Sequence, residues 1–206
     1  METKTVLAIL SEMARRMEEE KDYLTELDNI IADGDHGINM ARGFAALIKK
    51  LEGFGDKDIG TVLKTAGMTL VSAVGGSAGP LYGTAFMKAG MVMANKNTMD
   101  MSDFLSCIRA AVDGVMMRGR AVQGEKTMLD AMIPALQAME KANAGGASAK
   151  ATVEAGVAAA ASGVEYTKTI PATKGRASYI GERSIGHQDP GATSFTYLLD
   201  VVARAL

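Results

Sequence analysis

Apolar residues recur along most of the chain at the three- and four-residue spacing of an amphipathic α-helix. Val6, Ile9, Leu10, Met13 and Met17 form one such face, and comparable faces follow further along the chain. No stretch of four residues alternates with the β-branched and aromatic enrichment that is typical of a strand. The pattern predicts an all-α protein with helices over residues 4–28, 37–51, 57–74, 78–95, 101–118, 129–143, 148–166 and 190–204.

Two prolines bear on the predicted helix boundaries. Pro134 falls early in segment 129–143, where it either begins the regular helix or kinks it, since a proline inside a helix is destabilising by ~3 kcal/mol. Asp189-Pro190 is a strong start signal, because the carboxylate caps free amides and the proline lacks the donor that would go unpaired there. The last helix is therefore the better anchored of the two.

Short connections between the helices favour antiparallel neighbours, so the eight helices are expected to run up and down. The loops that follow the odd-numbered helices then share one end of the molecule. These loops are residues 28–39, 75–83, 119–128 and 167–191, whereas the alternate loops read as plain surface turns. Every chemically suggestive stretch of the sequence is thus expected at the same end.

Length and charge narrow the class of protein. The 206 residues suit a single domain spanning 1–206, and 22 basic against 24 acidic residues leave a formal charge of −2. Such a balance provides no overall electrostatic attraction for nucleic acid or an anionic membrane.

The single cysteine, Cys107, excludes an internal disulfide and favours a reducing compartment. No targeting segment stands out, so we expect a cytoplasmic protein. Residues 65–87 carry no formal charge, but glycines and Pro80 interrupt them, so they are not expected to span a membrane.

Three aspartates, Asp28, Asp33 and Asp35, crowd the first of the shared loops, with Gly34 and Gly37 to permit a tight turn. Carboxylates that converge repel one another unless a cation binds between them. Oxygen ligands suit Mg²⁺ or Ca²⁺, and the calcium-loop pattern fails at its glycine and glutamate positions, so Mg²⁺ is favoured. The plainer alternative is that these acids only cap a helix and stay solvated.

The second and third loops offer weaker signals. Gly75-Gly76-Ser77 leads into a helix, which suits phosphate binding by free amides, although a glycine turn capped by Ser77 explains it as well. Residues 119–127 imitate a Walker phosphate loop, but Glu125 precedes Lys126 and a helix rather than a strand precedes the segment, so we reject that interpretation.

The fourth loop, residues 167–191, is long and basic, with Lys168, Lys174, Arg176 and Arg183. Such loops are functional or disordered, and its apolar residues favour an ordered lid. The only two histidines, His36 and His187, lie at this same end. The Glu-x-x-His pairs of di-iron bundles are absent, so these histidines are expected to bind phosphate or to position the acids.

Four motifs resemble those of a known family. They read Asp-Gly-Asp-His-Gly-x-Asn at 33–39, Gly-Gly-Ser-Ala-Gly-Pro-Leu-Tyr-Gly at 75–83, Lys-Thr-Met-Leu-Asp at 126–130, and Gly-Arg-Ala-Ser-Tyr-Ile-Gly-Glu-Arg-Ser-x-Gly-His-x-Asp-Pro-Gly-Ala at 175–192. On these motifs the chain resembles the DhaL family, the nucleotide-binding subunits of dihydroxyacetone kinases, over essentially its whole length.

The resemblance implies a fold and a set of site residues. It implies an eight-helix antiparallel barrel that binds ADP or ATP at one end, with two Mg²⁺ ions held by Asp28, Asp33 and Asp35. It further implies that Arg176 joins these acids in catalysis. The nucleotide would contact His36, Gly37, Ile38, Asn39, Ser77, Ala78, Gly119, Met128, Arg176, Asp189, Pro190 and Gly191.

The resemblance also implies partners and leaves the reaction open between alternatives. A DhaK-like subunit would hold dihydroxyacetone, a DhaM-like phosphohistidine protein of the phosphotransferase system would rephosphorylate bound ADP, and the chain would form a homodimer. The alternatives are an ATP-dependent kinase subunit for dihydroxyacetone or another short ketose, such as a tetrose, and a regulatory module that contacts a transcription regulator.

Overall fold

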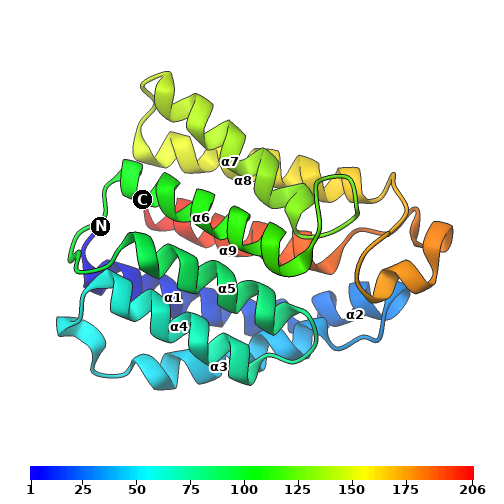
Figure 1. The fold of residues 1–206 in the computed structure, drawn as a ribbon, viewed down its shortest axis with the longest axis horizontal. Coiled ribbons are helices and arrows are strands. Elements are labelled where there is room, and N and C mark those ends of the chain that lie inside the picture. The colour runs from blue at the N-terminus through cyan, green and yellow to red at the C-terminus, as the bar shows by residue number, and fades with distance from the viewer.

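The computed structural model describes residues 1–206 and consists of helices joined by loops, with no strand (Figure 1). The all-α class is therefore confirmed. The α-helices are α1 (Thr3–Glu19), α2 (Lys21–Ile31), α3 (His36–Leu51), α4 (Ile59–Ala73), α5 (Ala78–Val92), α6 (Met101–Gly119), α7 (Leu129–Ala144), α8 (Ala149–Thr167) and α9 (Pro190–Ala205). Three short 3₁₀ helices, η1 (Phe54–Asp56), η2 (Arg176–Tyr179) and η3 (Gly181–Ser184), lie in the loops.

The predicted number of α-helices was wrong by one, because the first predicted helix is broken at Glu20. The backbone of Glu20 has ψ 4°, which ends α1, and α2 begins at the next residue. Met17 and Leu24, both fully buried, lie seven residues apart across the break. The apolar spacing therefore stays helical through the interruption, and the pattern contains no sign of it.

Each helix from α3 onward packs against the next along the chain, α9 packs against α1 and α2, and α1 packs against α3. One cluster of 44 buried residues fills the interior. It includes Phe44 of α3, whose ring meets Phe86 of α5 edge to face at 6.3 Å between centroids. Within this core lies a cavity of about 150 Å³ that hydrophobic residues alone line. It offers no polar group to a nucleotide.

Helix α7 continues through Pro134 from Leu129 to Ala144, so the proline does not begin the helix. A proline inside a helix leaves the carbonyl four residues earlier, here that of Asp130, without its usual donor. Gly163 of α8 packs directly on that carbonyl, since a Cβ on Gly163 would lie only 2.1 Å from the Asp130 oxygen. Gly163 thus permits close contact between α7 and α8 at the point where Pro134 interrupts the backbone hydrogen bonds of α7.

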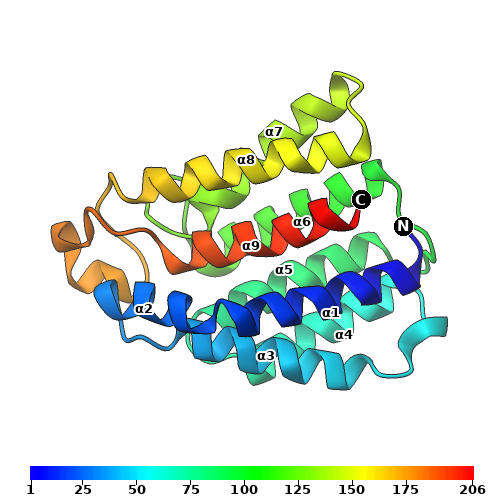
Figure 2. The same cartoon turned by 180° about the vertical axis from the view of Figure 1, so that it is seen from behind.

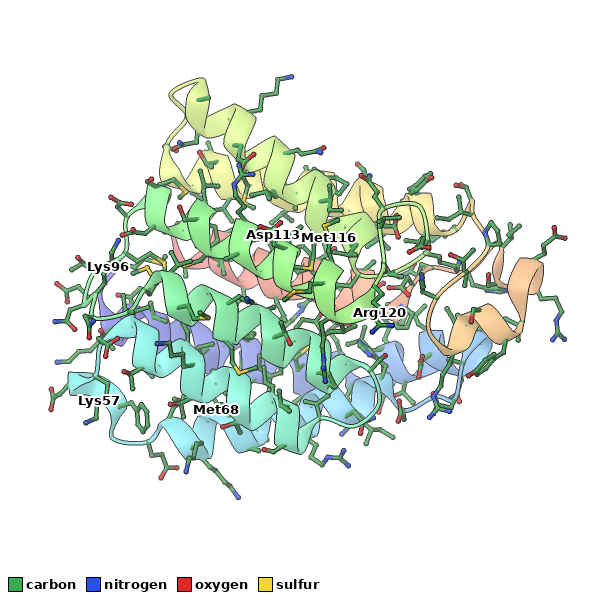
Figure 3. The ribbon with its side chains drawn as sticks, in the orientation of Figure 1. Lys57, Met68, Lys96, Asp113, Met116 and Arg120 are labelled. Atoms are coloured by element: carbon green, nitrogen blue, oxygen red, sulfur yellow. The ribbon has the colours of Figure 1, made fainter.

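The loops are divided between the two ends of the molecule as the antiparallel arrangement predicts. Both termini lie at one end, and α2 and the loop between α8 and α9 lie at the other (Figures 1 and 2). Figure 3 places Lys57 and Lys96 toward the first end and Arg120, which follows α6, toward the second. None of the helices has both the length and the apolar character needed to cross a bilayer.

Candidate functional site

A cavity of about 500 Å³ lies at the end of the molecule that the predicted loops share. Its lining comes from the four segments that the sequence singles out: the turn between α2 and α3, the glycine loop before α5, the loop between α6 and α7, and the α8–α9 loop with the start of α9. Residues far apart in the sequence therefore meet around one space. A volume of this size is typical of small-molecule sites.

Twelve of the residues predicted from the sequence line this cavity. They are Asp28, Asp33, Asp35, His36, Ser77, Ala78, Gly119, Met128, Arg176, Asp189, Pro190 and Gly191. Three others, Gly37, Ile38 and Asn39, do not line it.

These three residues belong to the first turns of α3, which packs on α2. A Cβ on Gly37 would lie 2.0 Å from the carbonyl oxygen of Lys21 in α2, and Asn39 is buried beside Gly75. The side chain of Ile38 is 51% exposed.

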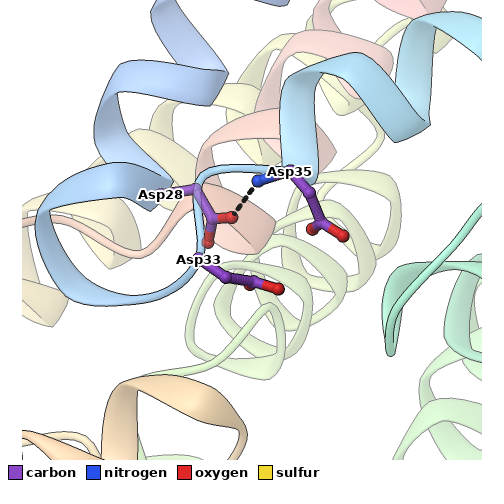
Figure 4. A group of neighbouring side chains, drawn as sticks. All are labelled: Asp28, Asp33 and Asp35. Carbon is purple, nitrogen blue, oxygen red and sulfur yellow. Dashed lines mark hydrogen bonds between the residues drawn. The ribbon is translucent and has the colours of Figure 1, made fainter.

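The turn between α2 and α3 brings the three aspartates together (Figure 4). Asp28, in the last turn of α2, is buried, and its Oδ2 accepts hydrogen bonds from the amides of Asp35 at 2.9 Å and His36 at 3.2 Å. The chain reverses at Gly34, whose φ of +70° is unfavourable for other residues. One carboxylate oxygen from each aspartate then lies within 4.8 Å of the others.

The helix-capping alternative explains only one of the three acids. Asp28 belongs to α2, but its carboxylate accepts hydrogen bonds from the amides of Asp35 and His36 at the start of α3 and so caps that helix. Asp35 stands at the N-cap position of α3, yet its side chain makes no capping hydrogen bond. The carboxylates of Asp33 and Asp35 are thus available to a ligand.

Electrostatics at this cluster favour a cation. Burial raises the pKa of Asp28, the two amide hydrogen bonds lower it, and repulsion from Asp33 and Asp35 raises it further. The Arg176 Nε lies 3.1 Å from Asp33 Oδ2 and is largely exposed, so it offsets this repulsion only weakly. Three converging carboxylates are the donor set that a hard divalent cation prefers, and the cluster fits Mg²⁺.

His36 lines the cavity, but its ring is committed to the protein. Its Nε2 lies 2.9 Å from the hydroxyl of Ser194, which is also 2.7 Å from the hydroxyl of Tyr82. Burial lowers the pKa of His36 to about 4, so the ring is neutral near pH 7. The residue joins α3, α5 and α9, and its amide helps to hold Asp28. The sequence predicts that His36 either binds phosphate or positions the acids, and these contacts favour the second role.

The glycine loop before α5 lies close to the acids. Gly76 has a φ of +62°, and a Cβ there would lie 3.8 Å from Asp35 Oδ1. Ser77 occupies the N-cap position of α5 without making a capping bond. The amides at the positive end of α5 therefore lie beside the carboxylates, an arrangement suited to a phosphate that shares a cation with them.

The segment between α8 and α9 is folded as an ordered lid, which we define as residues 168–188. It contains η2 and η3, and the hydroxyl of Ser184 accepts a hydrogen bond from the amide of Ala172 at 2.8 Å. Ala172 and Ala177 pack with Ile31 of α2 in a small cluster. This packing brings Arg176 over the acids.

Asp189 begins α9 immediately after the lid. Its Oδ2 accepts a hydrogen bond from the amide of Ala192 at 2.7 Å, as the start signal predicts. Burial raises the pKa of Asp189 to about 7. Pro190 and Gly191 follow in the cavity wall.

Three basic residues that line the cavity are not among the predicted site residues, namely Arg118, Lys126 and Lys174, although Lys174 belongs to the basic lid that the sequence predicts. Lys126 differs from the other two because it is buried and because its backbone is left-handed, with φ +59°. The signal in the sequence was its place in the Lys-Thr-Met-Leu-Asp motif. Burial itself carries no signal there, because a lysine in a loop is ordinarily exposed.

Comparisons with known proteins found a family model and related kinase subunits that match most of the chain. A family model described as "DAK2 domain" matches residues 30–204. The chain is 45% identical over 186 residues to the PEP-dependent dihydroxyacetone kinase, ADP-binding subunit DhaL, of Escherichia coli, covering 90% of this chain and 89% of that one. It is 43% identical over 195 residues to the ADP-binding subunit DhaL of PEP-dependent dihydroxyacetone kinase 1 of Listeria innocua, covering 95% and 92%.

A solved structure has the same fold. The dihydroxyacetone kinase of C. freundii in complex with AMP-PNP and Mg²⁺ superposes with a TM-score of 0.74 at 22% identity, covering 98% of this chain and 34% of that one.

Proposed function

The chain belongs to the DAK2-domain family, and from this premise we propose that it is the ADP-binding subunit of a PEP-dependent dihydroxyacetone kinase. The observation that carries the proposal is the convergence of Asp28, Asp33 and Asp35 at a cavity lined by the glycine loop and the lid. A nucleotide carries a polyphosphate that needs both a divalent cation and amide donors, and this cavity has residues for each. Similarity to subunits named for binding ADP supports the same ligand.

The three aspartates would hold Mg²⁺, and we propose two ions. ADP carries a charge of about −3, and the three carboxylates add to it, so a single divalent cation would leave most of the negative charge uncompensated. When bound, Mg²⁺ would supply charge neutralisation at the transferring phosphoryl group. Asp28 accepts hydrogen bonds from the amides of Asp35 and His36, which holds the turn that carries the other two acids.

The rest of the cavity would bind the nucleotide itself. The phosphates would lie at Ser77 and Ala78, at the positive end of α5, and the adenine and ribose would lie between Gly119 and Met128. The lid would close over them through Arg176, and the turn at Asp189, Pro190 and Gly191 would complete the wall. His36 would line the site while its ring holds α3 to α9. Gly37, Ile38 and Asn39, which lie outside the cavity wall, would support it through the packing of α3.

Phosphoryl transfer depends on positioning and on electrostatic stabilisation more than on a nucleophile from the protein. The site fits this requirement. The only cysteine, Cys107, is buried in α6 and is not part of the cavity wall, and the ring of His36 is neutral and bonded to Ser194. Arg176, which extends from the lid to Asp33, would stabilise charge on the transferring group.

The substrate and the phosphoryl donor would come from partners. We propose that a DhaK-like subunit presents dihydroxyacetone at the open side of the cavity, and that a DhaM-like phosphohistidine protein rephosphorylates the bound ADP. We further propose that the helices form an antiparallel barrel and that the chain forms a homodimer. The similarity to PEP-dependent subunits favours this reaction over an ATP-dependent tetrose kinase or a purely regulatory module.

The test is a reconstituted transfer assay. The purified chain, mixed with a DhaK-like subunit and dihydroxyacetone, is supplied either with phosphoenolpyruvate and the phosphotransferase proteins or with ATP alone. We expect sugar phosphate with the first donor set and loss of it when EDTA removes Mg²⁺. Sustained turnover with ATP alone would contradict the PEP-dependent reaction, and the absence of nucleotide binding would contradict the proposed function as a whole.

A further inference from the structure

Lys126, in the loop between α6 and α7, is a lysine that the fold buries completely, with 1% of its surface exposed. An ammonium group is stable away from water only where other acceptors replace its hydration. The Nζ of Lys126 donates hydrogen bonds to the backbone carbonyl oxygens of Thr167 and His187, and the carbonyl oxygen of Ile170 lies at 3.4 Å. Three carbonyl oxygens thus surround the charge.

The carboxylates near this ammonium group are engaged elsewhere. Asp130 accepts hydrogen bonds from the amides of Gly124 at 2.5 Å and Thr127 at 2.7 Å, and Asp189 caps α9. Lys126 is therefore tied to main-chain carbonyls rather than paired with an acid. Its Nζ is also occupied, so a direct role on phosphate, as in a Walker loop, does not agree with the geometry.

The three carbonyls come from the two ends of the lid. Thr167 is the last residue of α8, and His187 lies two residues before Asp189, where α9 is capped. The side chain of Lys126 therefore connects the C-terminus of α8 with the segment just before the N-terminus of α9. Thr167 makes a second tie at the same place, because its hydroxyl accepts a hydrogen bond from the amide of Asp189 at 2.9 Å.

The backbone at Lys126 points to the same function. Its φ of +59° is in the left-handed region, which a residue other than glycine adopts only where its surroundings hold it. Lys126, Thr127 and Met128 all line the cavity, and the left-handed turn directs the Nζ of Lys126 to the base of the lid. One short loop thus supplies both the wall of the cavity and the tie to the lid.

We propose that Lys126 is a positioning residue that keeps the base of the lid closed, so that Arg176 in the lid and Met128 in the loop face the same cavity. The consequence is control over how fast a bound nucleotide leaves. This part of the inference rests on the proposed function, whereas closure of the lid does not. Lys126 would therefore affect the nucleotide only through the position of the lid, without contacting the nucleotide itself.

The experiment compares Lys126→Met with a matched core variant, Val153→Ala. Methionine keeps most of the volume of lysine and removes the charge and its donors. Val153 is fully buried in α8, so its truncation destabilises the protein without touching the lid. The first readout is limited trypsin digestion without nucleotide, which reports cleavage within the lid after Lys168, Lys174, Arg176 and Arg183. The second is the dissociation rate of a fluorescent ADP analogue with Mg²⁺.

We expect Lys126→Met to be cleaved in the lid at least tenfold faster than the parent chain and to release the nucleotide at least tenfold faster. Val153→Ala should lower Tm with both rates unchanged. Parent-like rates in Lys126→Met, or equally raised rates in Val153→Ala, would overturn the inference. If the parent chain binds no Mg-ADP, the proposed function fails while the digestion result still decides the role of Lys126.

A second variant covers the case in which Lys126→Met does not fold. Thr167→Val is isosteric and removes the hydroxyl, which accepts a hydrogen bond from the amide of Asp189 and donates one to the carbonyl oxygen of Val164 in the same helix. We expect lid cleavage to accelerate several-fold in this variant. Cleavage at the parent rate would show that the base of the lid does not govern its closure.

Discussion

Replacement of Asp28 by asparagine should affect the protein in opposite ways with and without metal. In the parent chain a single oxygen of Asp28 accepts the hydrogen bonds from the amides of Asp35 and His36. Asparagine has the shape of aspartate and retains one carbonyl oxygen that can accept both. The turn between α2 and α3 should therefore keep its form. The substitution removes one negative charge from the acidic cluster.

The size of the effect follows from the separation of the carboxylates. Their oxygens lie within 4.8 Å, and at that distance two unit charges repel by about 0.9 kcal/mol in water and by about 3.5 kcal/mol at a dielectric constant of 20. Asp28 faces Asp33 and Asp35, and the raised pKa of Asp28 likewise indicates that its ionised form destabilises the fold. Weakening of the two amide bonds offsets about 1 kcal/mol. The metal-free variant should thus be as stable as the parent or more stable by about 1–3 kcal/mol.

Ligand binding should reverse the order. A ligand at 100 times its Kd stabilises a protein by about 2.7 kcal/mol, which for a chain of this length raises Tm by about 5–10 °C. The parent should show this rise with Mg²⁺ and ADP together. Asp28→Asn should show almost none at the same concentrations, because the cation loses a ligand.

Differential scanning fluorimetry in EDTA, in Mg²⁺, and in Mg²⁺ with ADP measures both effects. Asp113→Asn is the control, since Asp113 is an exposed acid on α6 outside the cavity wall (Figure 3). It should behave as the parent in all three conditions. A metal-free Asp28→Asn that melts below the parent yet keeps the full rise with Mg²⁺ and ADP would refute the reasoning.

Three further predictions concern other parts of the molecule. Gly37→Ala should lower the free energy of unfolding in urea by about 2 kcal/mol or more, because its Cβ would lie 2.0 Å from a backbone oxygen of α2. Arg176→Met should leave Tm within about 1 °C, since its ion pair with Asp33 is exposed, but should lower the rate of phosphoryl transfer roughly a hundredfold. The thiol of Cys107 should resist Ellman's reagent at pH 8 until urea unfolds the chain, because burial raises its pKa to about 12. Since the unfolded thiol ionises near pH 9, this raised pKa also makes the stability that Cys107 contributes fall as the pH rises from 9 toward 12.

Matched controls separate these effects from general damage. Gly55→Ala adds a methyl group where no atom lies within 4 Å, and it should leave urea unfolding unchanged. Arg183→Met removes another cation from the lid without altering the cavity wall, and its transfer rate should match that of the parent. Fast reaction of native Cys107 with the reagent would contradict its burial.

The helical class and most helix boundaries could be predicted from the sequence because they depend on local patterns. Apolar spacing identifies the buried face of a helix whatever that face packs against. Asp189-Pro190 begins α9 through a capping hydrogen bond that involves only neighbouring residues. The end of the molecule at which the cavity lies could be predicted from the same patterns. Antiparallel helices with short connections place alternate loops at one end, which is where Asp28, Ser77 and Arg176 line one cavity.

Tertiary structure decided which residues at that end face the cavity and which face the protein. Gly37 and Asn39 belong to the same motif as Asp35, but neither lines the cavity, because Gly37 packs against α2 and Asn39 lies behind Gly75 of the glycine loop. Lys126 is buried because the two ends of the lid meet beside it and supply carbonyl oxygens, which no sequence pattern around residue 126 records. Periodicity is a property of a few consecutive residues, whereas the orientation of a side chain toward a cavity depends on how distant helices dock. For that reason the sequence predicted the end of the molecule at which the cavity lies, and only the packing of α2, α3, α8 and α9 decided which residues face it.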